Sequence, residues 1–331
     1  MMAPHSEKNA TNAPQLQQTS RNHGGYERLL MACKSFSPVR MAVVHPCSAE
    51  ALEAALDARD NGLIVPVLVG PEARIRTLAQ VSGLDLGDIE IAATEHSHAS
   101  ADVAVGMARS GHVAALMKGS LHTDELLHAV LAKDSGLRTA RRLSHVFLMD
   151  VPSYPRPLMI TDAAINIYPT LADKCDIVQN AIDLAHRIGI AEPRVAILSA
   201  VETVNPAIRS TLDAAALCKM AERGQIRGGK LDGPLAFDNA VSLEAAHLKG
   251  IYSEVAGAAD VLIVPDLEAG NMLVKQLTFL ADADSAGIVL GARVPIVLTS
   301  RADSVRNRLA SIALGVLLAQ PQTASSATAS E

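Results

Sequence analysis

The sequence contains no tryptophan, and aromatic residues make up only 2% of its 331 positions. Because 49% of the residues are hydrophobic, we expect an interior built from aliphatic side chains and alanine. Proteins that bind nucleic acids usually stack bases on aromatic side chains and carry an excess of positive charge. With few aromatics and a formal net charge of −6, this chain is not expected to bind nucleic acid.

Cysteine is also scarce, and the four that occur are scattered without any C-x-x-C pairing: Cys33, Cys47, Cys175 and Cys218. This pattern predicts a reduced, cytoplasmic protein without a disulfide framework. No apolar run reaches the roughly 20 residues that a transmembrane helix needs, and the N-terminus lacks the apolar segment of a signal peptide. We therefore expect no membrane association.

Several familiar site motifs are missing. The chain has no G-x-G-x-x-G after a strand, no P-loop, no G-x-S-x-G and no H-E-x-x-H. Its eleven histidines show no metal-ligand spacing. The sequence thus predicts neither a bound metal nor an organic cofactor, and it excludes the common covalent hydrolases and zinc enzymes.

Apolar runs of strand length alternate with segments of helical periodicity from about residue 26 to residue 318. Strands are expected at 40–45, 63–69, 89–92, 113–117, 144–149, 158–160, 195–198, 261–264, 288–290 and 295–298, and helices at 26–35, 48–59, 100–110, 124–133, 171–188, 208–223, 272–280 and 305–318. A further helix is expected to start at Pro71. Such alternation is typical of an α/β protein with doubly wound, mostly parallel sheets.

The length of the chain favours two domains. We expect a first α/β domain from residues 26–140 plus 290–319 and a second from 141–289. The segments 1–25 and 320–331 are of low complexity and are expected to be a disordered extension and a disordered tail.

The stretch from Ala259 to Lys275 illustrates how strands feed polar loops. Its apolar run suits a strand buried on both faces, and Pro265 should end that strand. In the following loop Asp266 provides a polar group, Gly270 allows close approach of the backbone, and Asn271 can cap the next helix. Lys275 lies one turn further along. Ligands of open α/β sheets bind beyond the carboxyl ends of strands.

Four strands end in loops of this kind, at 118–123, 161–166, 266–271 and 299–303. The pair Ser300-Arg301 is the most informative, because a guanidinium matches a phosphate and the adjacent hydroxyl adds a donor. From the other loops we select Lys118, Gly119, Thr123 and Asn166 as further candidates for substrate binding. Asp162, Asp232, Asp238 and Asp266 suit either a base or a helix cap.

Four motifs occur in a fixed order along the chain: Asp232 to Ala240 (DGPLAFDNA), Val255 to Asp260 (VAGAAD), Pro265 to Asn271 (PDLEAGN) with Lys275, and Ser300-Arg301. Together they closely resemble the phosphate acetyltransferase/phosphate butyryltransferase family, from about Met41 to Leu318. The segments 117–120 and 299–304 resemble the branch that includes butyryltransferases.

The resemblance implies the reaction acyl-CoA + phosphate ⇌ acyl phosphate + CoA, for acyl groups in the acetyl to butyryl range. It implies direct attack of the CoA thiol in a ternary complex, with CoA as a substrate and no metal. It also implies a homodimer and a fold like that of isocitrate and isopropylmalate dehydrogenases, with a cleft between two domains. Ser300 and Arg301 match the family pair that binds the phosphoryl group.

The chain departs from the family at two positions. Phosphotransacetylases place an Asp, proposed as the thiol base, seven residues after the motif serine, where this chain has Asn307. Asp303 and Asp162 are the candidates to replace that base. The acetyltransferases also carry a phosphate-binding Arg where this chain has His128. Lys118 or one of Arg138, Arg141 and Arg142 is expected to supply the charge.

Two other functions remain open at this stage. The fold family also includes metal-dependent dehydrogenases of hydroxy acids, although this sequence lacks clustered metal-binding aspartates and a nucleotide loop. A protein that binds CoA or acyl phosphate without catalysis is the third possibility, because the usual base is missing.

Overall fold

The computed structural model describes residues 24–300 and 303–321. Its strands are β1 (Val39–Val44), β2 (Ile64–Gly70), β3 (Glu90–Ala93), β4 (Ala115–Lys118), β5 (Ser144–Asp150), β6 (Leu158–Thr161), β7 (Arg194–Leu198), β8 (Lys230–Leu235), β9 (Val261–Ile263), β10 (Asp284–Leu290) and β11 (Ile296–Val297). The α/β class and the predicted alternation are thereby confirmed.

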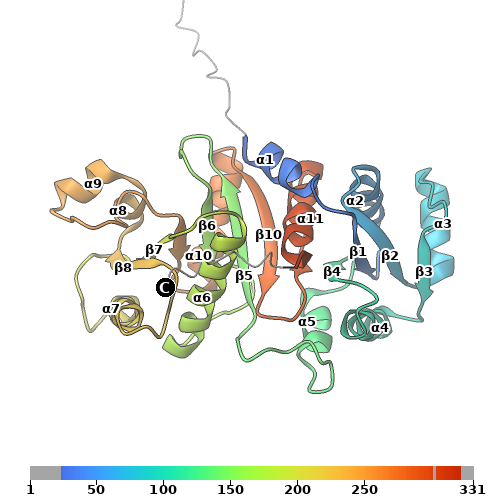
Figure 1. Cartoon of the computed structure of the whole chain (residues 1–331), viewed down its shortest axis with the longest axis horizontal. Helices are drawn as coiled ribbons and strands as arrows, with labels where there is room; N and C mark the ends of the chain where they lie inside the picture. The colour runs from blue at the N-terminus through green and yellow to red at the C-terminus, as the bar shows by residue number, and fades with distance from the viewer. Residues whose placement is uncertain (1–23, 301–302, 322–331) are drawn as a thin grey trace, which may run out of the picture.

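The helices flank the sheet (Figure 1). They are α1 (Gly24–Cys33), α2 (Ala49–Asp60), α3 (Glu72–Ser82), α4 (Ser97–Arg109), α5 (Thr123–Leu131), α6 (Leu171–Arg187), α7 (Arg209–Glu222), α8 (Phe237–Val241), α9 (Leu243–Leu248), α10 (Leu267–Leu280) and α11 (Val305–Ala319).

All eleven strands belong to one sheet, in the order β3-β2-β1-β4-β11-β10-β5-β6-β9-β7-β8. The pairs β11–β10, β10–β5 and β5–β6 are antiparallel, and the remaining pairs are parallel. The three antiparallel pairs lie together in the centre of the sheet. Strands on the two sides of this centre therefore run in opposite directions, which decides where each loop can contribute to a site.

Three elements were absent from the sequence-based expectation. Strand β8 and the short helices α8 and α9 lie in the glycine-rich and DGPLAFDNA segments, where the alternation of apolar residues is weak. One expected cap was also wrong. Helix α10 starts at Leu267 and not after Asn271, because the Asp266 side chain accepts the Ala269 N–H at 2.9 Å and caps the helix four residues earlier.

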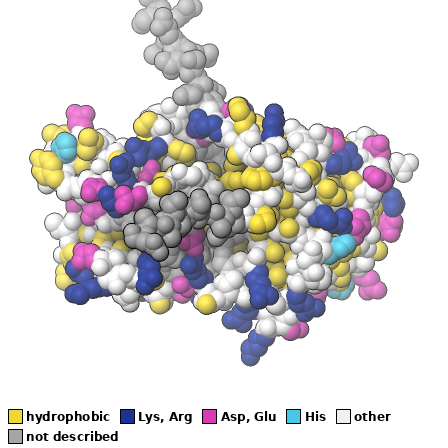
Figure 2. Space-filling model, in the orientation of Figure 1, with side chains coloured by type: hydrophobic (Ala, Val, Ile, Leu, Met, Phe, Trp, Pro, Cys, Tyr) yellow, Lys and Arg dark blue, Asp and Glu magenta, His cyan; other side chains and the backbone are white. Residues whose placement is uncertain are grey.

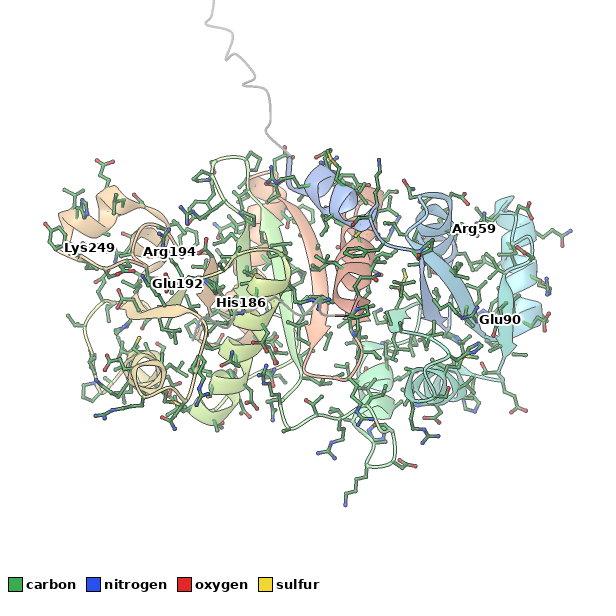
Figure 3. The ribbon with its side chains drawn as sticks, viewed as in Figure 1. Arg59, Glu90, His186, Glu192, Arg194 and Lys249 are labelled. Carbon is green, nitrogen blue, oxygen red and sulfur yellow. The ribbon has the colours of Figure 1, made fainter. Side chains whose placement is uncertain are left out.

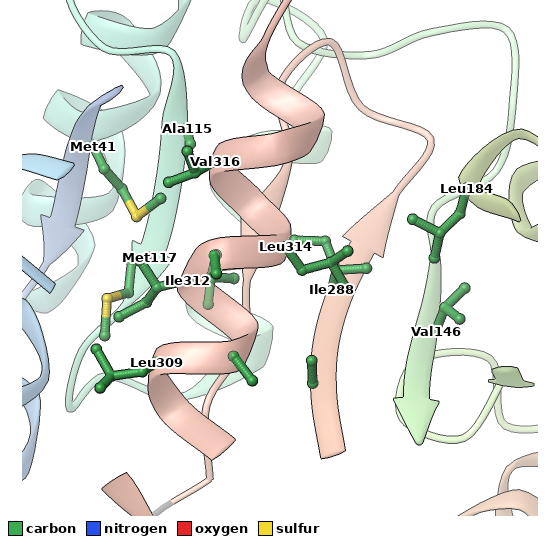
Figure 4. Close-up of a cluster of buried hydrophobic side chains, with 14 of the residues drawn as sticks. Met41, Ala115, Met117, Val146, Leu184, Ile288, Leu309, Ile312, Leu314 and Val316 are labelled. Carbon is green, nitrogen blue, oxygen red and sulfur yellow. The ribbon is translucent and has the colours of Figure 1, made fainter. Parts of the chain in front are cut away.

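One face of the sheet is covered by a single apolar cluster that runs through both halves of the chain. Helix α11 lies at its middle, between β4 and β10 (Figure 4). Leu309 and Ile312 face Met117 of β4, and Leu314 faces Ile288 of β10 (Figure 4). All of these side chains are buried, so α11 joins the first half of the sheet to its antiparallel centre.

The opposite face carries two separate apolar clusters. One packs β1, β4 and β11 against α4 and α5, and includes Val44, Leu116 and Ile296. The other packs β6, β7 and β9 against α8, α9 and α10. Side chains alternate between the faces of a strand, and Val146 belongs to the cluster around α11. His145 therefore points to the opposite face, between these two clusters.

Charged clusters lie at the two ends of the sheet, far from its centre. Glu90 on β3 pairs with Arg40 and His112, while Lys249 after α9 pairs with Glu202 and Asp238. Figure 3 shows Glu90 and Lys249 at opposite ends of the molecule. Their role is structural, at the sheet margins.

Candidate active site

The candidate residues fall into two groups. Each group lies along one of the two edges of the sheet that are formed by the ends of its strands. Strands β4 and β11 are parallel, so Lys118 and Ser300 follow carboxyl ends at one edge. Strands β6 and β9 run the other way, so Asp162 and Asp266 lie at the opposite edge. At about 3.3 Å per residue and 4.8 Å per strand spacing, the backbones of Ser300 and Asp162 are roughly 20 Å apart.

The first group centres on Ser300 and Asp303, which are hydrogen-bonded to each other. The Ser300 N–H donates to Asp303 Oδ2 at 2.6 Å, and the Asp303 N–H donates to the Ser300 carbonyl at 3.1 Å. Arg308 Nη1 donates to the Asp303 carbonyl at 3.1 Å, which ties Asp303 to α11. Arg301 lies outside the described residues. Ser300 is exposed three residues after the end of β11, as a substrate-binding hydroxyl requires.

Burial raises the pKa of Asp303, whereas the Ser300 N–H and the charges of Arg308 and Lys118 lower it. The influence of Lys118 on Asp303 places these two side chains in the same electrostatic environment. One carboxylate oxygen of Asp303 is already used by the Ser300 N–H. The arrangement suits a residue that orients Ser300.

Lys118 ends β4 beside Ser300 and Asp303. Its Nζ atom donates to the carbonyls of Gly119 and Leu121, both at 3.3 Å. A Cβ atom at Gly119 would lie 2.4 Å from the Val44 carbonyl oxygen, so only glycine lets the chain pass this close to β1. Thr123 is the first residue of α5, whose N-terminus therefore lies just after the Lys118 loop.

Asn307, where the resemblance places a thiol base, has a structural partner. Its Oδ1 atom accepts the Ser285 N–H at 3.2 Å, and one turn later Ser311 Oγ accepts the Gly287 N–H at 2.9 Å. Strand β11 is only two residues long, so these two side chains of α11 replace it as partners of β10. Sequence reasoning missed this role; the spacing of four between Asn307 and Ser311 was its only signal.

Asp162 is buried, and its two oxygens accept hydrogen bonds from neighbouring N–H groups. Oδ1 accepts from Ala164 and Ile165, both at 2.9 Å. Oδ2 accepts from the backbone of His145 and Asn166 and from Asn166 Nδ2. Five N–H donors leave little room for a thiol. These contacts favour a structural role for Asp162, in shaping the loop after β6.

The remaining candidates form the second group, at the opposite edge. Asn166 Nδ2 also donates to the Leu143 carbonyl, and Asn271 Nδ2 donates to the Ala163 carbonyl at 3.3 Å. A Cβ atom at Gly270 would lie 2.9 Å from Ala163 Cβ, so the helix α10 packs closely on the β6 loop. Lys275 is exposed on the next turn of α10. The loops after β6 and β9 are thus joined.

The basic loop between α5 and β5 borders this second group. A cavity of about 380 Å³ is lined by Arg138, Arg141, Arg142 and Asn166, among others. Arg141 pairs with Asp183, while Arg142 pairs with Asp173 and donates to Asn166 Oδ1. Figure 2 shows Lys and Arg side chains gathered at the lower edge of the molecule, where this loop lies in Figure 1. Of the four basic candidates, the structure places Lys118 beside Ser300 and Asp303.

Residues 24–300 and 303–321 lack two other kinds of site. No group of three or more His, Cys, Asp or Glu side chains in this part of the chain could hold a metal ion. Among its helices, none combines the length and the apolar character needed to cross a membrane.

Comparisons with known proteins give one consistent picture. A model of the family described as "Phosphate acetyl/butaryl transferase" matches residues 94–316. The phosphate acetyltransferase of Rhizobium meliloti is 62% identical over 304 residues, which cover 92% of this chain and 96% of that protein. The phosphate butyryltransferase of Clostridium acetobutylicum is 44% identical over 294 residues, covering 89% and 98%.

A solved structure agrees with these relatives. The crystal structure of a branched-chain phosphotransacylase from Enterococcus faecalis V583 superposes with a TM-score of 0.75 at 28% identity, over 85% of this chain and 99% of that one. Sequence and fold therefore point to the same class of proteins.

Proposed function

Because the chain belongs to the phosphate acetyl/butyryl transferase family, we propose that the Ser300 edge of the sheet is where it exchanges an acyl group between coenzyme A and phosphate. The chain is a transferase, and its relatives bear the names of both the acetyl- and the butyryltransferase. The substrates are acyl-CoA and phosphate, or acyl phosphate and CoA, with acyl groups in the acetyl to butyryl range.

One observation supports this location above the others. Two hydrogen bonds join Ser300 and Asp303, and Lys118 and the N-terminus of α5 lie at the same edge. Hydroxyl, ammonium and helix N-terminus all favour an anion. These three groups would stabilise the negative charge of an acyl phosphate bound there. Arg301 is proposed to hold its phosphoryl group.

The chemistry follows from what each group can do. The thiol of CoA gives its proton to water, the sulfur attacks the carbonyl carbon, and the bond from that carbon to the phosphate oxygen breaks, leaving its electron pair on the phosphate. Ser300 is proposed to donate to a phosphoryl oxygen, and Arg301 to stabilise the phosphate as it leaves. Asp303 is proposed to keep Ser300 in place, since positioning alone contributes strongly to the rate of a reaction between bound partners.

We place the nucleotide part of CoA toward the second group of residues. Asn166, Asp266, Gly270, Asn271 and Lys275 lie at the other edge, and a long, flexible substrate can reach from there to Ser300. A cleft of a two-domain architecture like that of isocitrate and isopropylmalate dehydrogenases would then run between the two groups of residues. Asp162 and its five N–H donors shape the loop on this side.

Two properties of the working enzyme are proposed on more general grounds. We expect a homodimer, as the resemblance implies, and sedimentation of the purified protein tests it. We also expect the enzyme to work in the cytoplasm; Cys33, Cys47, Cys175 and Cys218 are all free thiols in the structure.

Thioester formation tests the function directly. Purified protein is mixed with CoA and either acetyl phosphate or butyryl phosphate, without added metal or nucleotide, and absorbance of the thioester is followed. We expect prompt formation of acyl-CoA, and the two initial rates give the acyl preference. A folded protein that binds CoA without forming thioester from either substrate would instead be a binding protein.

Variants test the assignment of the site. Ser300→Ala and Arg301→Ala are each expected to lower kcat/KM at least about 100-fold. Arg293→Ala, in the exposed loop between β10 and β11, is the matched control and should leave the rate unchanged. Full activity of Arg301→Ala would refute the phosphate clamp.

A further inference from the structure

His145 lies at the centre of the sheet face between the two apolar clusters. It is only 1% exposed, and its ring contacts Phe147, with centroids 4.4 Å apart. Its backbone is fixed on both sides: the N–H donates to Asp162 Oδ2 at 3.2 Å, and the carbonyl accepts Thr161 Oγ1 at 2.8 Å. Burial and the contact with Phe147 hold the ring in place.

The two nitrogens of this ring differ in their surroundings. Nδ1 is fully enclosed and has no hydrogen-bond partner within the described chain. The same is not true of Nε2. A buried N–H without an acceptor is rarer in proteins than an acceptor without a donor. The proton of the neutral ring is therefore assigned to Nε2, and the lone pair to Nδ1.

Gly287 lets the backbone of β10 lie close to the imidazole edge. A Cβ atom on Gly287 of β10 would lie 2.9 Å from His145 Nε2 and 3.2 Å from the Leu298 carbonyl oxygen. The imidazole edge thus adjoins the segment Leu298–Ser300, which leads into the candidate phosphate site. Any side chain at position 287 would occupy the space between them.

The ring is neutral under ordinary conditions. Burial lowers the pKa of His145 to about 4, and the nearby Asp162 charge acts in the opposite direction. A neutral imidazole is a hydrogen-bond donor that keeps its proton, as a group polarising a carbonyl should. Anionic phosphate is better matched by Lys118 and Ser300 at the edge, so the donor here faces the uncharged acyl part.

We propose that His145 Nε2–H donates to the carbonyl oxygen of the acyl group and stabilises its negative charge during transfer. This rests on the proposed transferase function. When the sulfur bonds to the carbonyl carbon, the C=O electron pair moves to oxygen, and Nε2–H holds that oxyanion. The pair then returns, the bond from carbon to the phosphate oxygen breaks, and phosphate leaves. The imidazole keeps its proton throughout.

The test compares three variants in the thioester assay. His145→Leu removes the donor but fills the space, and should lower kcat about 10²–10³-fold while KM for CoA and for acetyl phosphate stays within about threefold. His145→Gln restores an N–H donor and should recover part of kcat. Gly287→Ala puts a methyl group against Nε2 and should also lower kcat. Gly106→Ala on α4, with nothing within 4 Å of the added Cβ, is the control.

A second measurement reports on the ring itself. In wild-type protein, ¹⁵N NMR of His145 should show a protonated Nε2 and an unprotonated Nδ1 near neutral pH. The opposite tautomer would overturn the proposal, and so would a folded His145→Leu variant with kcat within about threefold of wild type. If wild-type protein forms no thioester, the transferase function fails and this role fails with it; an active wild type with an unaffected variant refutes the role of His145 alone.

Discussion

Asn307 offers the most direct test of how α11 supports the site. Its Oδ1 atom accepts the Ser285 N–H of β10 at 3.2 Å, and its own N–H donates to Ser304 Oγ at 3.1 Å. The side chain is only 7% exposed. Asn307→Ala leaves a buried N–H of β10 without its partner, which costs about 1–3 kcal/mol of unfolding free energy.

The same substitution should loosen the first turn of α11. Arg308 follows Asn307 directly and holds the carbonyl of Asp303, so a shift of this turn moves Ser300. We expect kcat to fall about tenfold, because misplacement of a reacting group by even 1 Å is costly. Urea unfolding measures the stability, and the thioester assay measures kcat.

The variant Asn307→Asp tests whether Asn307 serves only as a structural hydrogen-bond partner or stands where a catalytic base is missing. The carboxylate oxygen can still accept the Ser285 N–H, so we expect kcat within about threefold of wild type and an unchanged pH profile. A rise of tenfold or more, with a new dependence on a group titrating near pH 4, would show that the enzyme lacked a base and that our account of Asn307 is wrong.

Three further predictions concern the framework. Lys174 and Asp213, which are 4% and 7% exposed and 2.8 Å apart, form a buried ion pair between α6 and α7; Lys174→Ala should cost about 3–5 kcal/mol in urea unfolding, whereas Lys219→Ala in an exposed pair should cost under about 1 kcal/mol. Gly119→Ala should cost at least about 1–3 kcal/mol and most of the activity, because its Cβ would collide with the Val44 carbonyl; wild-type stability and rate would contradict that reading. His145 binds a proton more readily when unfolded, so its contribution should make stability fall from about pH 6.5 to about pH 4, by at most about 1.4 kcal/mol per pH unit, and His145→Leu should flatten this slope.

The sequence predicted most elements because burial of apolar residues follows a simple period. The run Val261–Val264 and the helix around Leu171–Arg187 are examples in which pattern and structure agree within a residue or two. Strand β8 was not predicted, because Asp232, Gly233 and Pro234 are poor strand formers. It forms because it pairs with β7 in the folded chain.

The candidate site was predictable in its parts and less so in its arrangement. Ser300 and Lys118 follow strand patterns that can be read locally, and the structure brings their loops to one edge. Strand direction cannot be read in this way, so the local patterns do not reveal that the loops of Asp162 and Asp266 lie at the other edge. The roles of Asn307 and His145 depend on contacts with β10, which is 22 residues from Asn307 and far from His145 in sequence.

Helix α11 carries a consequence for the order in which the protein is made. Its residues pack on Met117 of β4 and Ile288 of β10, and Gly315 allows it to approach Val297 closely. In a growing chain, the part of the apolar face of β1 to β4 that α11 covers stays exposed until residues 305–319 emerge, although α2 packs on this face earlier. During synthesis the first half of the chain therefore exposes apolar surface that favours aggregation. We expect its folding to depend on chaperones or to be completed only when α11 has been synthesised.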